Sequence, residues 1–130
     1  MNNKRIDQVV REYAEEIEEA QMGYWKFSYQ DCLLLVLTDD SHNRMRVICP
    51  IANSNDISDE TVRQCMEANF DRALDARYAT SGEYLWSAFI HPLEELQDSQ
   101  FIDALNQVST LAQNFGTTYT SSDLLFGGGS

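Results

Sequence analysis

The apolar residues near the N-terminus recur at intervals of three and four positions, as the side chains on one face of a helix do. Ile6, Val10 and Ile17 belong to this series, and glutamates occupy the opposite face. This spacing is typical of an amphipathic helix. Gly23 can adopt the left-handed conformation that commonly ends a helix. The pattern therefore predicts a first helix over residues 3–20.

After this helix the spacing changes to alternation, which is typical of a strand with one buried face. Strands are expected at residues 25–29, 32–37 and 44–51. The middle strand is apolar at every position from Cys32 to Leu37, which indicates a central strand covered on both faces. Because short polar links join the three segments, we expect an antiparallel meander.

The second half of the chain repeats the change from helical to alternating spacing. Ser58 is a suitable N-cap for a second helix that runs to about Leu74. A hairpin of two strands is expected at residues 77–80 and 84–90, and a last helix at residues 101–115. The predicted order is helix, three strands, helix, two strands, helix.

These elements predict an α+β fold in a single domain. A chain of 130 residues is long enough for one core. We expect residues 1–120 to place three helices on one face of a five-stranded antiparallel sheet, in the order α-β-β-β-α-β-β-α. Residues 121–130 are expected to form a C-terminal tail, and the sequence leaves open whether its apolar segment 124–126 docks on a surface.

The charge of the chain limits its partners. The formal net charge is -12 and the pI is about 4.3. A surface this acidic repels phosphate backbones and anionic lipids, so we expect neither a nucleic acid nor a membrane as partner. The longest apolar run is too short to span a bilayer, and the polar N-terminus is unlike a secretion signal.

The three cysteines, Cys32, Cys49 and Cys65, are widely spaced and lie within apolar segments. Isolated cysteines of this kind are typical of reduced thiols that pack as small apolar side chains. The sequence therefore predicts a cytoplasmic protein.

Reactive side chains do not have the spacing of a catalytic, cofactor-binding or metal site. Neither His42 nor His91 belongs to a metal-ligating motif. Residues 39–43 resemble the start of a calcium-binding loop, but Arg44 stands where glycine is needed and Pro50 where glutamate is needed. We therefore expect no enzyme activity, no cofactor and no metal.

Apolar surface is the remaining candidate for function. The strands carry more aromatic side chains than one core face needs: Trp25, Phe27, Tyr29, Tyr78, Tyr84 and Trp86. Aromatic residues are favoured anchors at interfaces, so a dimer contact or a peptide groove explains the excess. Packing of all of them inside the protomer is the alternative.

The order of elements and several short segments also resemble a known family. The segments are Arg44–Ile51, Ala68–Asp71, Ala73–Leu74, Ala76–Ala79, Leu85–Leu93, Phe101–Val108 and Phe126–Gly129. Together they are similar to the type III secretion chaperone superfamily, in particular to its YbjN-like group.

This resemblance implies a small acidic cytoplasmic protein, usually a homodimer, that binds an extended polypeptide along an apolar surface. In secretion chaperones the dimer contact involves the second helix and the neighbouring strand, which correspond here to Val62, Met66 and Phe70 and to Tyr78. The expected dimer or peptide interface comprises Val62, Met66, Phe70, Tyr78, Trp25, Phe27 and Trp86. The leading hypothesis is a non-enzymatic, chaperone-like module that binds itself and an unidentified protein or peptide client.

Two other hypotheses stay open at this point. One is a small-molecule-binding protein or enzyme with a pocket between sheet and helices, lined by His91, Trp86 and Arg77. A ligand of such a pocket would raise the melting temperature. The other is a structural subunit of a larger assembly.

Overall fold

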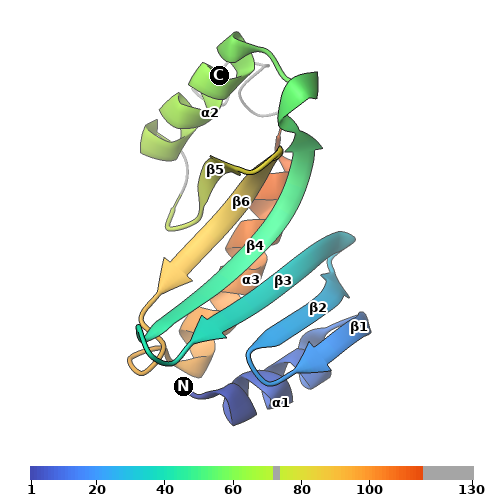
Figure 1. The fold of residues 1–130 in the computed structure, drawn as a ribbon, viewed down its shortest axis with the longest axis vertical. Coiled ribbons are helices and arrows are strands. Elements are labelled where there is room, and N and C mark those ends of the chain that lie inside the picture. The colour runs from blue at the N-terminus through green and yellow to red at the C-terminus, as the bar shows by residue number, and fades with distance from the viewer. Residues whose placement is uncertain (72–73, 116–130) are drawn as a thin grey trace.

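The computed structural model describes residues 1–71 and 74–115 of the chain. Along these residues the helices and strands follow one another as drawn in Figure 1. They are α1 (Asn3–Tyr13), β1 (Glu16–Gln21), β2 (Tyr24–Tyr29), β3 (Cys32–Asp39), β4 (Arg44–Asn53), α2 (Asp59–Asp71), β5 (Arg77–Ser81), β6 (Tyr84–His91) and α3 (Asp98–Gln113), with a 3-10 turn, η1 (Ser54–Asp56), before α2. The expected C-terminal tail, residues 121–130, lies outside the described residues.

The strands form one antiparallel sheet in the order β1-β2-β3-β4-β6-β5. The predicted α+β class, the three-stranded meander and the later hairpin are confirmed. The described part of the sheet has six strands and not the expected five. The additional strand is β1, at the edge beside β2.

The predicted first helix is too long, because α1 ends at Tyr13 and β1 occupies the remainder of the expected helix. The backbone N–H of Glu15 already bonds to the carbonyl of Ser28 in β2. A helix over this segment would also stack glutamates three and four positions apart, where like charges repel. Pairing with β2 separates them and brings Lys26 within 3.5 Å of Glu18.

A β-bulge explains why β1 has the apolar spacing of a helix. Ile17 is paired with Phe27 and Ala20 with Trp25, and the register shifts between them at Glu18. In a regular strand, residues three positions apart face opposite sides. The extra residue of the bulge restores Ala20 to the side of Ile17, so both pack against the core.

Two helices, and not all three, cover the inner face of the sheet. Residues of α1 and α3 share one buried cluster with the inward side chains of the strands, and α3 lies directly behind the sheet in Figure 1. The inward side chains of the central strands are Trp25, Phe27, Tyr29, Leu34, Val36, Met45, Val47, Cys49 and Phe89. The helix α2 lies at the other end of the molecule from α1, next to β5 (Figure 1).

The second helix starts as the sequence predicts. The hydroxyl oxygen of Ser58 accepts a hydrogen bond from the backbone N–H of Thr61 at 3.1 Å, which is the geometry of an N-cap. A small second cluster joins α2 to the sheet: Cys65 and Ala68 pack against Tyr78 and Leu85. The main core and this cluster leave the other face of the sheet without a helix in the described part of the chain.

Candidate protein-binding surfaces

The side chains that could take part in catalysis or metal binding are spread through the described part of the fold and do not form one site. Among the described residues, no group of three or more His, Cys, Asp or Glu side chains is arranged to hold a metal ion. His42, in the turn before β4, forms a hydrogen bond with Asp39 at the end of β3, and His91 forms one with the carbonyl of Pro92. Within the same residues, no helix has the length and apolar character needed to cross a membrane.

Two of the three thiols, those of Cys32 and Cys49, are in surroundings that disfavour the thiolate. Burial raises the pKa of Cys49 to about 12, and burial also raises the pKa of Cys32. A nucleophilic cysteine needs the opposite shift. Both side chains therefore act as packing groups under α3.

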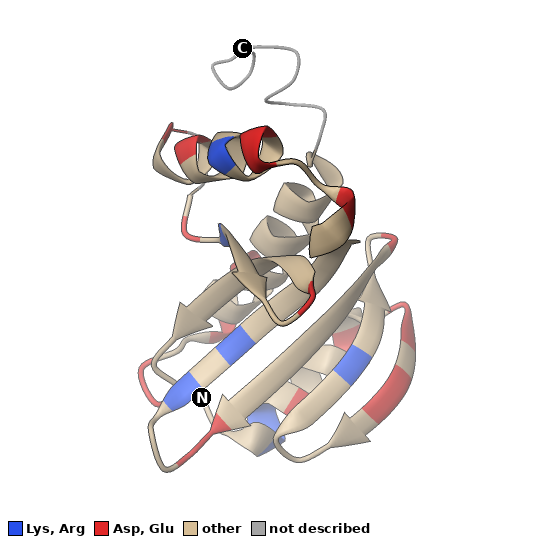
Figure 2. Cartoon of the chain, turned by 45° about the horizontal axis from the view of Figure 1, so that its top comes forward, with Lys and Arg blue, Asp and Glu red and all other residues tan. Residues whose placement is uncertain are grey.

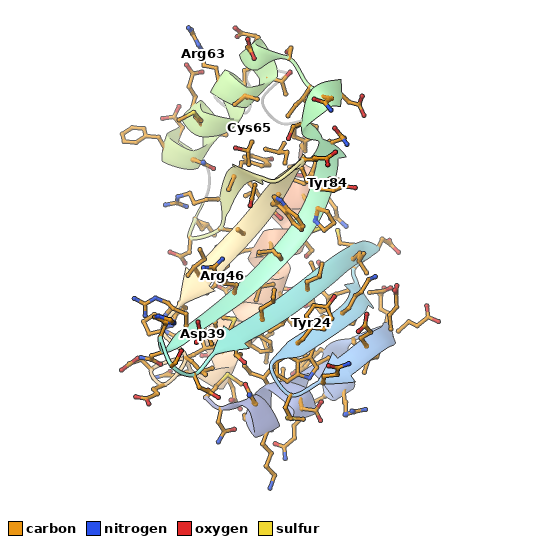
Figure 3. The ribbon with its side chains drawn as sticks, viewed as in Figure 1. Tyr24, Asp39, Arg46, Arg63, Cys65 and Tyr84 are labelled. Atoms are coloured by element: carbon orange, nitrogen blue, oxygen red, sulfur yellow. The ribbon has the colours of Figure 1, made fainter. Side chains whose placement is uncertain are left out.

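An apolar surface covers the outer face of the sheet, which we call the open face. Its apolar side chains alternate with the buried ones and are half-buried or exposed: Leu33, Leu35, Leu37, Ile48, Trp86, Ala88 and Ile90. Ile90 is the most exposed of them, at 57%. The reader faces this side of the sheet in Figures 1 and 3, where Tyr24, Arg46 and Tyr84 project from it.

A second apolar surface lies on α2, which we call the α2 face. Met66 is 68% exposed, Phe70 is 91% exposed, and Leu74, just beyond the helix, is 73% exposed. Because Met66 and Phe70 are four positions apart, they lie on one side of the helix. Cys65 and Ala68 occupy the opposite side and are buried.

The structure divides the expected interface residues between these surfaces and the interior. Met66 and Phe70 lie on the α2 face, beside the half-buried Val62. Trp86 lies on the open face and is half-buried. Tyr78 is 6% exposed, and its hydroxyl donates to the carbonyl of Leu111 in α3.

Trp25 and Phe27 are fully buried beneath α1 and α3, so a partner of the folded protomer does not reach them. The reason is their register, because Trp25 is paired with Val36 and Phe27 with Leu34, both of which face the helices. Their outward neighbours on β2 are Tyr24, Lys26 and Ser28. The alternating aromatic residues Trp25, Phe27 and Tyr29 therefore belong to the core.

The open-face residues of β3 were missed by the sequence interpretation. The continuous apolar run predicted a strand covered on both faces, but only Leu34 and Val36 are fully buried. Leu33, Leu35 and Leu37 point to the uncovered side. The signal was available in the chain, since three helices are too few to cover both faces of the sheet.

The pocket that the alternative hypothesis requires contains two of its three expected lining residues. A groove of about 390 Å³ at the lower end of β6 brings Arg77 and His91 together with Asp75 and Asp103. Trp86, the third residue expected there, is not among its lining residues and lies on the open face.

Comparison with solved structures identifies the class of fold. The structure of the HopA1–SchA chaperone–effector complex contains a chain with TM-score 0.62 and 11% identity, covering 84% of this chain and 88% of that one. The ExsC–ExsE complex gives TM-score 0.62, 12% identity and coverage of 96% and 97%. The Yersinia pestis type III secretion chaperone SycH, in complex with a fragment of YscM2, gives TM-score 0.60, 10% identity and coverage of 88% and 96%.

The chain therefore has a type III secretion chaperone-like fold, and the predicted resemblance is confirmed at that level. No protein family model and no curated protein sequence matches the chain. Membership of the YbjN-like group stays a prediction.

Proposed function

We propose that this protein is a non-enzymatic, chaperone-like module that acts as a homodimer and binds an extended segment of a client protein. The observation that carries the proposal is the presence of two separate apolar surfaces on one small protomer, the α2 face and the open face. Large exposed apolar patches on soluble proteins mark interaction sites. Two such patches suit a protein that has both a partner copy and a client.

The two surfaces have different shapes and suit different tasks. The α2 face is a convex ridge of Met66 and Phe70 on one helix, and two such ridges can pack around a two-fold axis as an isologous contact. The open face is broader, because it extends over β3, β4 and β6. A broad sheet face with apolar side chains can receive an amphipathic segment along its length.

The structural neighbours support the same assignment. One of them is described as a chaperone–effector complex and another as a secretion chaperone bound to a protein fragment. Both of those proteins hold a polypeptide partner, and the present chain has the same fold with an apolar sheet face that no helix covers within residues 1–71 and 74–115.

Binding of a permanently unfolded polypeptide tests the proposal. Reduced and carboxymethylated α-lactalbumin is mixed with the protein, and complex formation is measured by size-exclusion chromatography with light scattering. We expect a complex with the wild-type protein and about tenfold weaker binding by Ile90→Glu, which places a charge on the open face.

Met22→Glu is the matched control, because Met22 is 60% exposed and lies in the turn between β1 and β2, whereas Ile90 is 57% exposed on the sheet. This variant is expected to bind as the wild type does. If the wild-type protein forms no complex, or if both variants bind as well as the wild type, the proposed client surface is wrong.

A further inference from the structure

The open face carries cationic side chains although the chain as a whole is acidic. Of the nine lysines and arginines, Arg44 and Arg46 lie on the outward side of β4. Figure 2 shows blue segments along β4, and red segments along β1, on α2 and in the turn that precedes β4. The outward side of β4 therefore carries two cations on a molecule of net charge -12, with Asp39 of β3 opposite Arg44.

Arg46 lies between two apolar neighbours. In the sheet register it is opposite Leu37 of β3 on one side and Ile90 of β6 on the other. It also lines a shallow groove of about 650 Å³ with Leu37, Thr38, Asp39, His42 and Arg44. A segment that covers Leu37 and Ile90 must also cover the guanidinium group.

The guanidinium of Arg46 has no hydrogen-bond or ion-pair partner among the described residues. Three other cations have carboxylate partners, namely Arg5 with Asp98, Arg11 with Asp7, and Lys26 with Glu18. Arg44 donates to the backbone carbonyl of Asn43. The nearby carboxylate of Asp39 is already held by the hydroxyl of Ser41 and by His42.

A free guanidinium among apolar side chains restricts what can dock there. A purely apolar segment would bury an unpaired charge, which is strongly unfavourable. A carboxylate in the segment removes this penalty, because it can accept two parallel hydrogen bonds from the planar guanidinium. Apolar cover then lowers the local dielectric constant and strengthens the pair.

We propose that the open face selects an acidic amphipathic segment, in which apolar side chains contact Leu35, Trp86 and Ile90 and a carboxylate pairs with Arg46. This inference rests on the proposed function, since it assigns the chemistry of the client for the same surface. The acidic remainder of the molecule repels such a segment elsewhere, so the cationic side of β4 determines where it binds.

Fluorescence anisotropy with two labelled peptides tests the selectivity. Both peptides have the same helical apolar positions, and their flanking positions are all glutamate in one and all lysine in the other. We expect the glutamate peptide to bind about tenfold more tightly than the lysine peptide. Arg46→Glu is expected to remove this preference, and Arg46→Gln to weaken it.

Lys4→Glu is the matched control, because it makes the same change in net charge at an exposed position of α1, outside both apolar surfaces. It is expected to keep the preference of the wild type. Equal losses in Arg46→Glu and Lys4→Glu, or a tighter complex with the lysine peptide, would show that only the net charge acts and would overturn the proposal. Conversion of a wild-type dimer to a monomer by Arg46→Glu would assign the face to a second copy and overturn it as well.

The two proposals fail in different ways. If unfolded α-lactalbumin binds and Ile90→Glu weakens that binding, the client surface stands, and an absence of charge preference overturns only the role of Arg46. If the wild-type protein binds neither α-lactalbumin nor either peptide, the proposed function itself is wrong. Thermal denaturation of each variant verifies that it is folded.

Discussion

Asp7 connects the first helix to the sheet through one partly buried hydrogen bond. The indole Nε1 of the fully buried Trp25 donates to Asp7 Oδ1 over 3.0 Å, and the guanidinium of Arg11 donates to Asp7 Oδ2 over 2.9 Å. These bonds, first that from Arg11 and then that from Trp25, hold the pKa of the Asp7 carboxyl below its ordinary value. The charged form of Asp7 is therefore favoured in the folded state.

This shift predicts how the stability of the protein depends on pH. A carboxyl whose pKa is lower in the folded than in the unfolded state stabilises the fold above its unfolded pKa of about 4. The contribution is lost as the pH falls through the lower, folded value. We expect Asp7→Asn to reduce the free energy of unfolding by about 1 kcal/mol at neutral pH, and the difference from the wild type to shrink below about pH 4.

Urea denaturation followed by tryptophan fluorescence between neutral and acidic pH measures this difference. Asp56→Asn, at an exposed position of η1, is the control and is expected to follow the wild-type curve. A constant difference for Asp7→Asn at every pH would contradict the assignment, because it would reflect altered packing alone.

Asn69 illustrates how a single side chain can protect a sheet edge. Its amide oxygen accepts from the backbone N–H of Tyr78 at 2.8 Å, and its amide nitrogen donates to the Tyr78 carbonyl at 3.0 Å. The side chain thus takes the place of a neighbouring strand at the outer edge of β5. An edge satisfied in this way is less available for pairing with another chain.

At the scale of elements, α2 is attached to the fold by few buried side chains. Among its described residues it buries Cys65 and Ala68, whereas α3 buries Phe101, Ala104, Leu105, Val108 and Ser109. The opposite side of α2 exposes Met66 and Phe70. We infer that the α2 face gains its cover from the second copy of the proposed dimer.

A substitution on the α2 face is therefore expected to change the oligomeric state. Light scattering at micromolar concentration is expected to give twice the chain mass of 14.9 kDa for the wild type. Phe70→Glu is expected to give a monomer, because a two-fold contact would bring the negative charges of the two copies together in an apolar interface. The free-energy cost of this exceeds what the apolar contact contributes. The side chain is 91% exposed, so the protomer is expected to stay folded.

Tyr13→Glu supplies the comparison, because Tyr13 is also an exposed aromatic residue, at 41%, but lies at the end of α1. It is expected to keep the dimer mass. A wild-type protein that stays monomeric, or a Phe70→Glu variant that stays dimeric, would show that α2 is not the contact.

At the scale of the whole molecule, charge opposes association. Each copy carries a net charge of -12, and the α2 face is flanked by Glu67 and Asp71. A two-fold contact through α2 brings these carboxylates together. Association must then be driven by apolar burial against electrostatic repulsion.

Salt is therefore expected to strengthen the dimer. Raising the ionic strength from about 0.02 M to about 0.3 M shortens the screening length to several ångströms and is expected to lower the dimer dissociation constant roughly three- to tenfold. Sedimentation velocity over a concentration series measures this constant. Weaker association at high salt would indicate intermolecular ion pairs and contradict an apolar α2 contact.

Local patterns in the sequence were sufficient for most elements of the fold. The alternation of Trp25, Phe27 and Tyr29, the N-cap at Ser58 and the helical spacing from Phe101 to Val108 all reflect burial of one side of an element, and burial of one side leaves a period in the sequence. The first helix was extended too far because the bulge at Glu18 gives β1 the spacing of a helix. A bulge depends on the partner strand, and a local pattern does not contain that information.

Which residues form the candidate surfaces was harder to predict from local patterns than the helices and strands were, because exposure of a sheet face depends on tertiary structure. The exposed side of α2 follows from its own composition, since Met66 and Phe70 stand opposite Cys65 and Ala68. The period of a strand separates its two faces but is the same whichever face is covered, so the sequence alone could establish that the sheet has two apolar faces. Packing of α1 and α3 decided that Trp25 and Phe27 are buried and that Leu35 and Arg46 are left on the open face, because the side on which distant helices pack is set by long-range contacts.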